Sequence, residues 1–246
     1  GGGYSTPVVA DGCIFVAYFL PTGLTRAEWV QGACGGMQIS KLTGRIEADD
    51  ILLCIDGRSG RTLWKAVLKS KGFFGGPSGV LMTPCVADGR VFFIGSAGRL
   101  YCVNAADGTP LWEGSIGEEA QRIRQLVRAS VEGKEGAPGF KMDLCSSPAV
   151  ADGVVACNDN KGGLIGFDAA TGGQLWGPIP DCISKTCSPV RWVHQGREYF
   201  IAAASRAVCV EPRTGRIVWE QPDVANEGTV AVCEQYMVFS GGGKKK

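Results

Sequence analysis

A short motif that occurs four times constrains the fold more than any other feature of the chain. In every copy an acidic or Asn residue is followed four residues later by Gly and eight residues later by Trp. Repetition of this kind indicates an architecture in which one structural unit is used several times. The motif residues are Asp56, Gly60, Trp64, Asn104, Gly108, Trp112, Asp168, Gly172, Trp176, Glu211, Gly215 and Trp219.

A second landmark, a hydroxyl residue followed by Pro, precedes each motif. Three of the four copies continue into the sequence Val-Ala-Asp-Gly, and the fourth has Gln195-Gly196 in the equivalent place. Proline is tolerated at the first residue of a strand and Asp-Gly is a hairpin-turn sequence, so each landmark predicts a strand that carries the Pro and enters a hairpin. The landmarks are Thr6-Pro7, Thr83-Pro84, Ser147-Pro148 and Ser188-Pro189.

Each unit has enough short apolar runs for four strands. Residues 52–55, 91–94 and 100–103 are predominantly apolar runs rather than strict alternations, which is typical of strands covered on both faces. Four short antiparallel strands per unit predict an all-β fold, a β-propeller of four-stranded antiparallel blades. The predicted single domain, residues 1–246, has four full blades at about 5–69, 82–116, 146–179 and 187–221, part of a fifth at 228–240, and insertions at about 21–50 and 113–143.

Most of the eleven cysteines fit inside this repeat. Cys54, Cys102 and Cys209 lie two residues before the first motif position, where the third unit has Gly166. A buried Cys behaves as a small hydrophobe, so the pattern predicts a confined place for a small side chain. Core packing is therefore the preferred interpretation of these cysteines over a metal or redox role.

The repeat closely resembles the pyrroloquinoline-quinone (PQQ)-like propeller repeat, from about residue 5 to 240, apart from the two insertions. The segment from Asp168 to Trp176 follows almost fully that family's tryptophan-docking pattern, Ala-x-Asp-x-x-Thr-Gly-x-x-x-Trp. The resemblance implies that the four motif tryptophans are structural. Each would pack between neighbouring blades, against a turn that the motif Thr and Gly complete.

A repeat of this kind specifies the fold better than the function. The resembling family contains BamB-like scaffolds of outer-membrane assembly, which are not enzymes, and PQQ-dependent quinoprotein dehydrogenases, which hold the quinone with a calcium ion and use a carboxylate base. Adjacent cysteines and the CxxCH haem motif, which accompany many such dehydrogenases, do not occur in the sequence. We therefore expect a non-enzymatic scaffold for a protein or small ligand, without a cofactor. The alternative is part of a dehydrogenase with PQQ and calcium.

The charge and hydropathy of the sequence indicate which partners and which membrane relationship to expect. The formal net charge is +1, so nothing favours a nucleic-acid partner, and we interpret Lys244–Lys246 as a solvated tail. We expect no membrane span, since no apolar run is long enough, and the sequence opens without a signal peptide. The family resemblance implies a periplasmic or other extracytoplasmic location.

Because the first unit already has four strands, we expect a fragment of a longer propeller rather than a closed ring.

Alternating strand directions place both insertions on one face of the predicted propeller. The segment 118–130 has the spacing of a short amphipathic helix with interspersed arginines. Aromatic and Arg side chains gathered at one rim would form an interaction surface. Equally, the helix could simply bury the two phenylalanines. The candidate surface consists of Trp29, Phe73, Phe74, Arg122 and Arg128.

Four other features carry weaker signals. His194, the one histidine of the sequence, is predicted in a turn on the opposite face, which disfavours histidine acid–base chemistry on the loop-rich face. Residues 158–160 (Asn-Asp-Asn) could ligate a cation, but a plain polar turn is the preferred interpretation. Cys182 and Cys187 share a predicted loop and could pair in an oxidising compartment. The Gly-rich stretches 32–36 and 72–79 lack the Lys-Ser/Thr of a phosphate-binding loop and are interpreted as loops.

Overall fold

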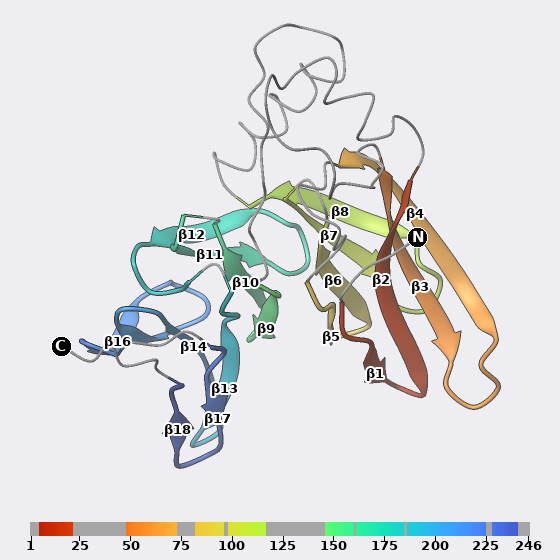
Figure 1. The fold of residues 1–246 in the computed structure, drawn as a ribbon. Helices are drawn as coiled ribbons and strands as arrows, with labels where there is room; N and C mark the ends of the chain where they lie inside the picture. The colour runs from red at the N-terminus through yellow and green to blue at the C-terminus, as the bar shows by residue number, and fades with distance from the viewer. Residues whose placement is uncertain are drawn as a thin grey trace, which may run out of the picture.

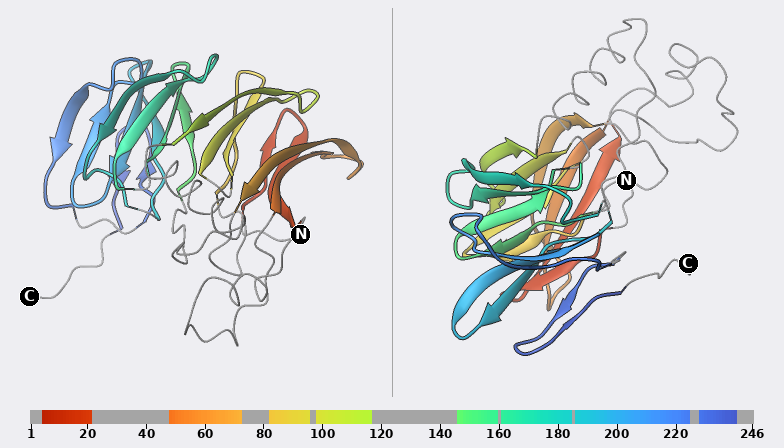
Figure 2. Two further views of the ribbon diagram at one scale, coloured as in Figure 1. Left: turned by 90° about the horizontal axis from the view of Figure 1, so that it is seen from above. Right: turned by 90° about the vertical axis from the view of Figure 1, so that its left-hand side faces the viewer.

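A computed structural model of the protein describes eight segments of the chain, and the regular elements in them are all β-strands. The described residues are 5–21, 48–72, 82–95, 98–116, 146–159, 161–184, 186–224 and 228–240. Four sheets have four strands each, and one has two. The sheets stand side by side in chain order (Figures 1 and 2). The predicted all-β propeller fold with four-stranded antiparallel blades is confirmed.

Within each blade the strands pair in chain order, each antiparallel to the next. Blade one comprises β1 (Val8–Ala10), β2 (Cys13–Pro21), β3 (Ala48–Asp56) and β4 (Thr62–Gly72). Blade two comprises β5 (Cys85–Ala87), β6 (Arg90–Ile94), β7 (Arg99–Asn104) and β8 (Pro110–Ser115). Blade three comprises β9 (Ala149–Ala151), β10 (Val154–Asn158), β11 (Leu164–Asp168) and β12 (Gln174–Ile179). Blade four comprises β13 (Val190–His194), β14 (Arg197–Ala203), β15 (Ala207–Val210) and β16 (Ile217–Gln221), and the two-stranded sheet comprises β17 (Ala231–Val232) and β18 (Met237–Val238).

The first two strands of every four-stranded blade are joined by a tight turn with positive φ at both central residues. In blade one these residues are Asp11 (φ 49°) and Gly12 (φ 76°), and in blade four they are Gln195 (φ 49°) and Gly196 (φ 73°). Two positive φ values define the type I′ turn, whose twist matches that of the flanking strands. Gln195-Gly196 therefore takes the structural place of Asp-Gly, as the sequence predicted.

The prolines of the repeat lie just outside the strands that were predicted to carry them. Pro84 immediately precedes β5 and Pro148 immediately precedes β9. Proline has no N–H to offer a sheet, so pairing begins at the next residue. The prediction that the first strand contains the Pro is wrong by one residue in each blade.

The cores lie between neighbouring blades. Phe92 and Cys102 of blade two pack with Val155 and Phe167 of blade three. All five residues of β10 are buried, which agrees with the apolar run of its first four residues. Burying an aromatic or aliphatic side chain of this size stabilises the fold by about 1.5–3 kcal/mol. The hydrophobic clusters are thus shared between neighbouring blades.

The first strands of successive blades also lie next to one another, β1 beside β5, β5 beside β9, β9 beside β13 and β13 beside β17. The hydroxyl residue that precedes each first strand accepts a hydrogen bond from the backbone N–H of its counterpart in the preceding blade. The bonds run from Thr6 to Thr83 (3.3 Å), Thr83 to Ser147 (2.8 Å), Ser147 to Ser188 (2.9 Å) and Ser188 to Thr229 (3.1 Å). This series links all five sheets at their first strands.

The strands extend into the ends of both predicted insertions. β2 continues to Pro21 and β3 begins at Ala48, while β8 continues to Ser115. Pairing of β2 with β3 reaches Pro21 and Ala48, which is why the insertion begins later than predicted. The rest of both insertions lies outside the described residues. Within the part of the chain that the structure describes, no helix has the length and hydrophobicity of a membrane span.

Candidate functional site

The residues predicted to form the interaction surface, Trp29, Phe73, Phe74, Arg122 and Arg128, all lie outside the described residues, as does the helix predicted at 118–130. That surface stays a prediction. The described residues allow two other parts of the molecule to be built atom by atom. These are the contacts of the motif residues between blades, and a hollow beside blade four.

Three motif tryptophans contact the following blade. Each indole Nε1–H donates a hydrogen bond to a backbone carbonyl of the next blade, at the residue after the first motif position. The bonds run from Trp64 to Ala105 (3.0 Å), from Trp112 to Ala169 (3.1 Å) and from Trp176 to Pro212 (2.6 Å). The indole of one blade is therefore hydrogen-bonded to the main chain of the next blade, which fixes the two blades relative to each other.

The motif glycines receive these rings. A Cβ added to Gly108 would lie 2.5 Å from the ring of Trp64, and one added to Gly172 would lie 2.6 Å from the ring of Trp112. Gly215 stands in the same relation to Trp176, at 2.5 Å. No side chain fits between the turn and the ring, so glycine is required at these positions by contact as well as by φ.

The acidic motif residues close their own turns. Asp168 accepts hydrogen bonds from the backbone N–H groups of Ala170 (3.0 Å) and Thr171 (2.8 Å) and from the Thr171 hydroxyl (3.0 Å). These bonds lower the pKa of Asp168, the backbone N–H of Thr171 being the main cause. The Ser59 hydroxyl lowers the pKa of Asp56 in the same way. These carboxylates therefore stabilise their own turns by accepting hydrogen bonds, and they stay ionised at neutral pH.

The cysteine position of the repeat lies directly opposite the tryptophan. Cys54 pairs with Trp64, Cys102 with Trp112, Cys209 with Trp219, and in blade three Gly166 pairs with Trp176. A β-bulge follows immediately in all four blades. A Cβ on Gly166 would overlap the ring of Trp176, so this is a confined position, as the cysteine pattern indicated. Burial raises the pKa of Cys54, Cys102 and Cys209 to about 12, which keeps these thiols protonated.

The side chains of the polar turn after β10 form hydrogen bonds with nearby backbone groups. Asp159 Oδ1 accepts the backbone N–H groups of Lys161 (2.7 Å) and Gly163 (2.8 Å), and Asn158 donates its amide to the Ser184 carbonyl (2.8 Å). These bonds agree with the preferred interpretation of residues 158–159 as a polar turn; residue 160 lies outside the described residues.

No disulfide joins Cys182 and Cys187, although both are buried. The Cys182 thiol donates to the carbonyl of Ile179 (3.1 Å), and the Cys187 thiol donates to that of Gly228 (3.1 Å). Cys182 is thus held by the end of β12 in its own blade, and Cys187 by the segment that precedes β17. Both side chains are buried in the cluster between blades three and four.

Blade four departs from the repeat in its first hairpin. β13 has five residues where β1, β5 and β9 have three, and its partner β14 has seven. The added length shifts the turn to Gln195-Gly196, so His194 ends β13 rather than lying in the turn, and that prediction is wrong. The imidazole stacks on the indole of Trp192, with ring centroids 4.6 Å apart and an interplanar angle of 20°.

The Trp192–His194 stack contacts the turn between β17 and β18. Trp192 Nε1–H donates to the carbonyl of Cys233 (2.9 Å), and His194 Nδ1 lies 3.3 Å from the carbonyl of Glu234. Tyr199, the cross-strand partner of Trp192, also packs against it, at a centroid separation of 5.7 Å. The lengthened hairpin is thereby pinned to the two-stranded sheet.

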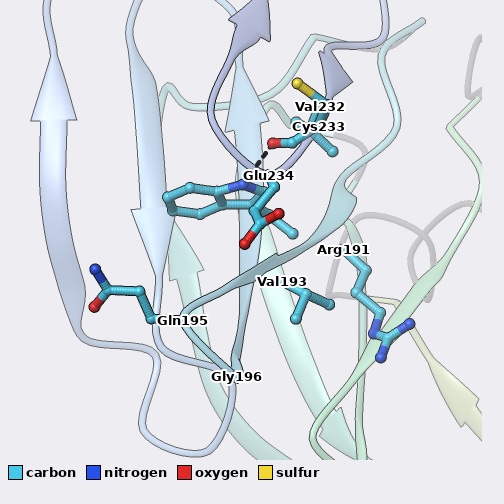
Figure 3. A pocket seen from close by; sticks show the side chains of 8 residues that line it. Arg191, Val193, Gln195, Gly196, Val232, Cys233 and Glu234 are labelled. Carbon is cyan, nitrogen blue, oxygen red and sulfur yellow. Dashed lines mark hydrogen bonds between the residues drawn. The ribbon is translucent and has the colours of Figure 1, made fainter.

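An open hollow of about 370 Å³ lies between these two hairpins (Figure 3). Trp192 lines it, whereas Val193, which is 42% exposed, is the next residue of β13 and points to the opposite face of the sheet. Arg191 and Glu234 place opposite charges on its rim. The remaining lining residues are Gln195, Gly196, Val232 and Cys233.

The guanidinium of Arg191, on the rim of the hollow, is held in place by a neighbouring carboxylate. Arg191 forms an ion pair with Glu198, and Glu198 also accepts the backbone N–H of Asp152 in blade three (2.6 Å). The carboxylate raises the pKa of Arg191, and the guanidinium lowers the pKa of Glu198. β13 therefore presents an indole on one face, and an exposed aliphatic side chain with a fixed positive charge on the other. An edge of this composition suits reversible binding of a mixed apolar and polar surface.

Sequence reasoning missed Trp192 and Val193 because they lie in a lengthened strand and form no motif. A signal was present. From the landmark Pro to the motif Trp there are 28 residues in blades two and three and 30 in blade four. An insertion within a repeat maps to a loop on one face, often the binding face.

Comparisons with known proteins show which family and which solved structures this chain is similar to. A sequence profile of the family described as outer membrane protein assembly factor BamB matches residues 48–241. The structure of BamB from Moraxella catarrhalis is 15% identical, with a TM-score of 0.45 over 75% of this chain and 52% of that chain. Quinohemoprotein alcohol dehydrogenase from Comamonas testosteroni is 16% identical, with a TM-score of 0.50 over 93% of this chain and 37% of that chain. No curated protein sequence matches the chain.

The chain spans about half of that BamB structure and little more than a third of that dehydrogenase. At these identities the solved structures support the fold alone. The family profile covers most of the sequence, including all four tryptophan motifs from their first residue to the last and the whole of blades two, three and four. The chain belongs to the BamB family of PQQ-like propeller proteins.

Proposed function

We propose that the chain is a non-enzymatic scaffold that binds a protein partner in outer-membrane protein assembly. The family description supports the process, and the hollow beside blade four supports the binding role. The single observation that carries the proposal is the departure of blade four from an otherwise regular repeat. Blades one to three keep a three-residue first strand, whereas blade four lengthens it and adds Trp192 and Val193.

The residues that line the hollow indicate what kind of partner surface would bind there. The exposed Val193 favours an apolar contact with the partner on one face of β13, and Trp192 offers an aromatic contact on the other, since aromatic residues supply much of the binding energy at protein interfaces. Arg191 and Glu234 favour a partner segment with complementary charges beside these contacts. The surface predicted from Trp29 and the Phe73–Phe74 pair would lie on the opposite face, and we propose it as a second contact.

A quinone site is less well supported by the described residues. Calcium requires six to eight oxygen ligands, and the Asn158–Asp159 turn is the acidic, amide-bearing turn singled out for a cation. Asp159 Oδ1 already accepts two backbone N–H groups, and the Asn158 amide holds the Ser184 carbonyl. These bonds support a structural role for the pair in its own turn, and we propose that the chain binds no PQQ.

The enzyme alternative is tested by titrating the purified protein with PQQ and calcium chloride. We expect no saturable quinone absorbance and no reduction of a redox dye in the presence of an alcohol. Stoichiometric binding with turnover would overturn the scaffold proposal.

We also propose a periplasmic location, supported by the description of the family as an outer-membrane assembly factor. Fractionation of cells that express the full gene would check this. The protein should partition with a periplasmic marker, and recovery with cytoplasmic markers would contradict the proposal.

A further inference from the structure

Blade one has a second cysteine beside the position opposite its tryptophan. Cys13 is the first residue of β2, and it pairs with Asp56 of β3, two residues beyond Cys54. Phe15 is the direct partner of Cys54. Residues two apart on a strand share a face of the sheet, so Cys13 and Cys54 lie diagonally across the strand pair on the same face.

The two thiols are in contact. A side-chain hydrogen bond joins them, and Cys13 packs against the hydrophobic cluster that contains Cys54. Cys54 is fully buried, whereas Cys13 is half-exposed. The pair therefore has one sulfur that solvent can reach and one that it cannot.

This arrangement is absent from the two following blades. The residue at the register of Cys13 is Arg90 in blade two, paired with Asn104, and Val154 in blade three, paired with Asp168. Cys102, the counterpart of Cys54 in blade two, accordingly has Arg90 in place of a second thiol. Blade two supplies a matched control for any chemistry of the pair.

We propose that Cys13 and Cys54 form a reversible disulfide, made by thiol–disulfide exchange with a small-molecule disulfide. Diagonal positions of an antiparallel pair place the Cα atoms about 7–8 Å apart, slightly beyond the usual span of a disulfide. Starting from hydrogen-bonded thiols, closure therefore requires rotation of both side chains together with a small shift of the strands.

The exchange has two steps. First, the Cys13 thiolate attacks one sulfur of the small disulfide, which forms a mixed disulfide on Cys13 and releases one small thiol. Second, the Cys54 thiolate attacks the Cys13 sulfur and releases the other small thiol. Two protein thiols are oxidised to one disulfide, the small disulfide is reduced to two thiols, and the protons of Cys13 and Cys54 pass to the released thiolates.

The burial difference sets the order of these steps. An external disulfide can reach Cys13 but not Cys54, so Cys13 reacts first. Burial, with a smaller contribution from Cys13 itself, raises the pKa of Cys54 to about 12. Only a small fraction of Cys54 is thiolate at neutral pH, so the second step should accelerate about ten-fold for each unit of pH between 7 and 9.

The experiment exposes the reduced, folded protein to oxidised glutathione, quenches with an alkylating reagent and maps tryptic peptides by mass spectrometry. Cys13 and Cys54 fall in the separate tryptic peptides 1–26 and 46–58, each with a single cysteine. We expect a cross-linked pair of these peptides that a reducing agent separates, formed faster at pH 9 than at pH 7. The Cys102→Ser variant should form the same cross-link.

Two variants separate the steps. Cys54→Ala should stop the reaction after the first step and retain one glutathione on Cys13, whereas Cys13→Ser should leave Cys54 unmodified. Stable glutathione on Cys13 in the unsubstituted protein, with no cross-linked peptide, would overturn the proposal because it would show that the sulfurs cannot close. Labelling of Cys54 in Cys13→Ser at the rate of the cross-link would overturn the proposed order.

Discussion

The backbone N–H of Thr83 donates a hydrogen bond of 2.8 Å to the side-chain hydroxyl of Ser147, which lies 64 residues further along the chain. Equivalent bonds occur at the other blade junctions. The hydroxyl residue of the second, third and fourth landmarks therefore acts as an acceptor for the blade before it. This role explains why the residue before Pro84, Pro148 and Pro189 is Thr or Ser.

Removing one such acceptor should weaken a single blade junction. Ser147→Ala leaves the Thr83 N–H without its partner, which should lower the free energy of unfolding by about 1 kcal/mol. Ser147→Thr keeps a hydroxyl and serves as the control. Chemical denaturation of both variants measures the difference, and equal stabilities would contradict the role assigned to the hydroxyl.

The motif glycines permit a test that separates backbone strain from ring contact. Gly108 (φ 75°) and Gly60 (φ 68°) have similar backbones, but only Gly108 lies against a tryptophan; Gly60 has nothing within 4 Å of an added Cβ. Gly60→Ala should cost about 1 kcal/mol for the left-handed conformation. Gly108→Ala should cost about 2–4 kcal/mol, because its Cβ would also overlap Trp64. Similar losses in thermal denaturation would show that ring contact contributes nothing.

The indole hydrogen bond can be separated from the packing of its ring. Trp176 is 9% exposed and donates to the Pro212 carbonyl. Trp176→Phe removes the donor and part of the ring and should cost about 1–2 kcal/mol, whereas Trp176→Ala should cost about 3–5 kcal/mol. Urea unfolding curves provide the comparison. A Phe variant as stable as the parent would show that the hydrogen bond is dispensable.

Buried thiols should make the fold sensitive to alkali. Burial raises the pKa of Cys102 and Cys209 from 9.0 to about 12. The unfolded chain therefore loses these protons at lower pH than the folded chain, so their contribution to stability is complete below pH 9 and declines as pH rises toward 12. Each thiol should contribute a slope of about 1.4 kcal/mol per pH unit at most.

The control for the alkaline effect lies within the same chain. Cys102→Ala should flatten the decline of the thermal midpoint between pH 9 and 11, relative to its own value at pH 7. Cys233→Ser, at an exposed position, should leave the decline as it is in the parent. An unchanged slope in Cys102→Ala would contradict the assignment.

The repeating parts of the molecule could be predicted because each is specified by a local pattern. The Asp-Gly turns, the unbroken apolar strands and the confined position of Cys54 all follow from residues close in sequence. The partners of Trp64 and Ser147 in other blades do not, because the contact spans a whole blade. Four copies of one motif indicate that a contact exists, but only the three-dimensional structure identifies the atoms that meet.

The site beside blade four was less predictable for a different reason. Trp192 and Val193 follow no motif, and their importance lies in the difference between blade four and its neighbours. The two extra residues between Pro189 and Trp219 were visible in the sequence, but length alone does not reveal that the hairpin meets β17 and β18. Trp29 and the other members of the predicted loop-rich surface lie outside the described residues and stay predictions.

The scaffold proposal is tested most directly by a photo-reactive amino acid placed at Val193 in cells that express the chain naturally. The control site is Leu63, which is 54% exposed on the fourth strand of blade one. The account predicts that position 193 cross-links to a component of outer-membrane protein assembly and that position 63 does not. No adduct at 193 in a folded protein, or the same adducts at both positions, would contradict it.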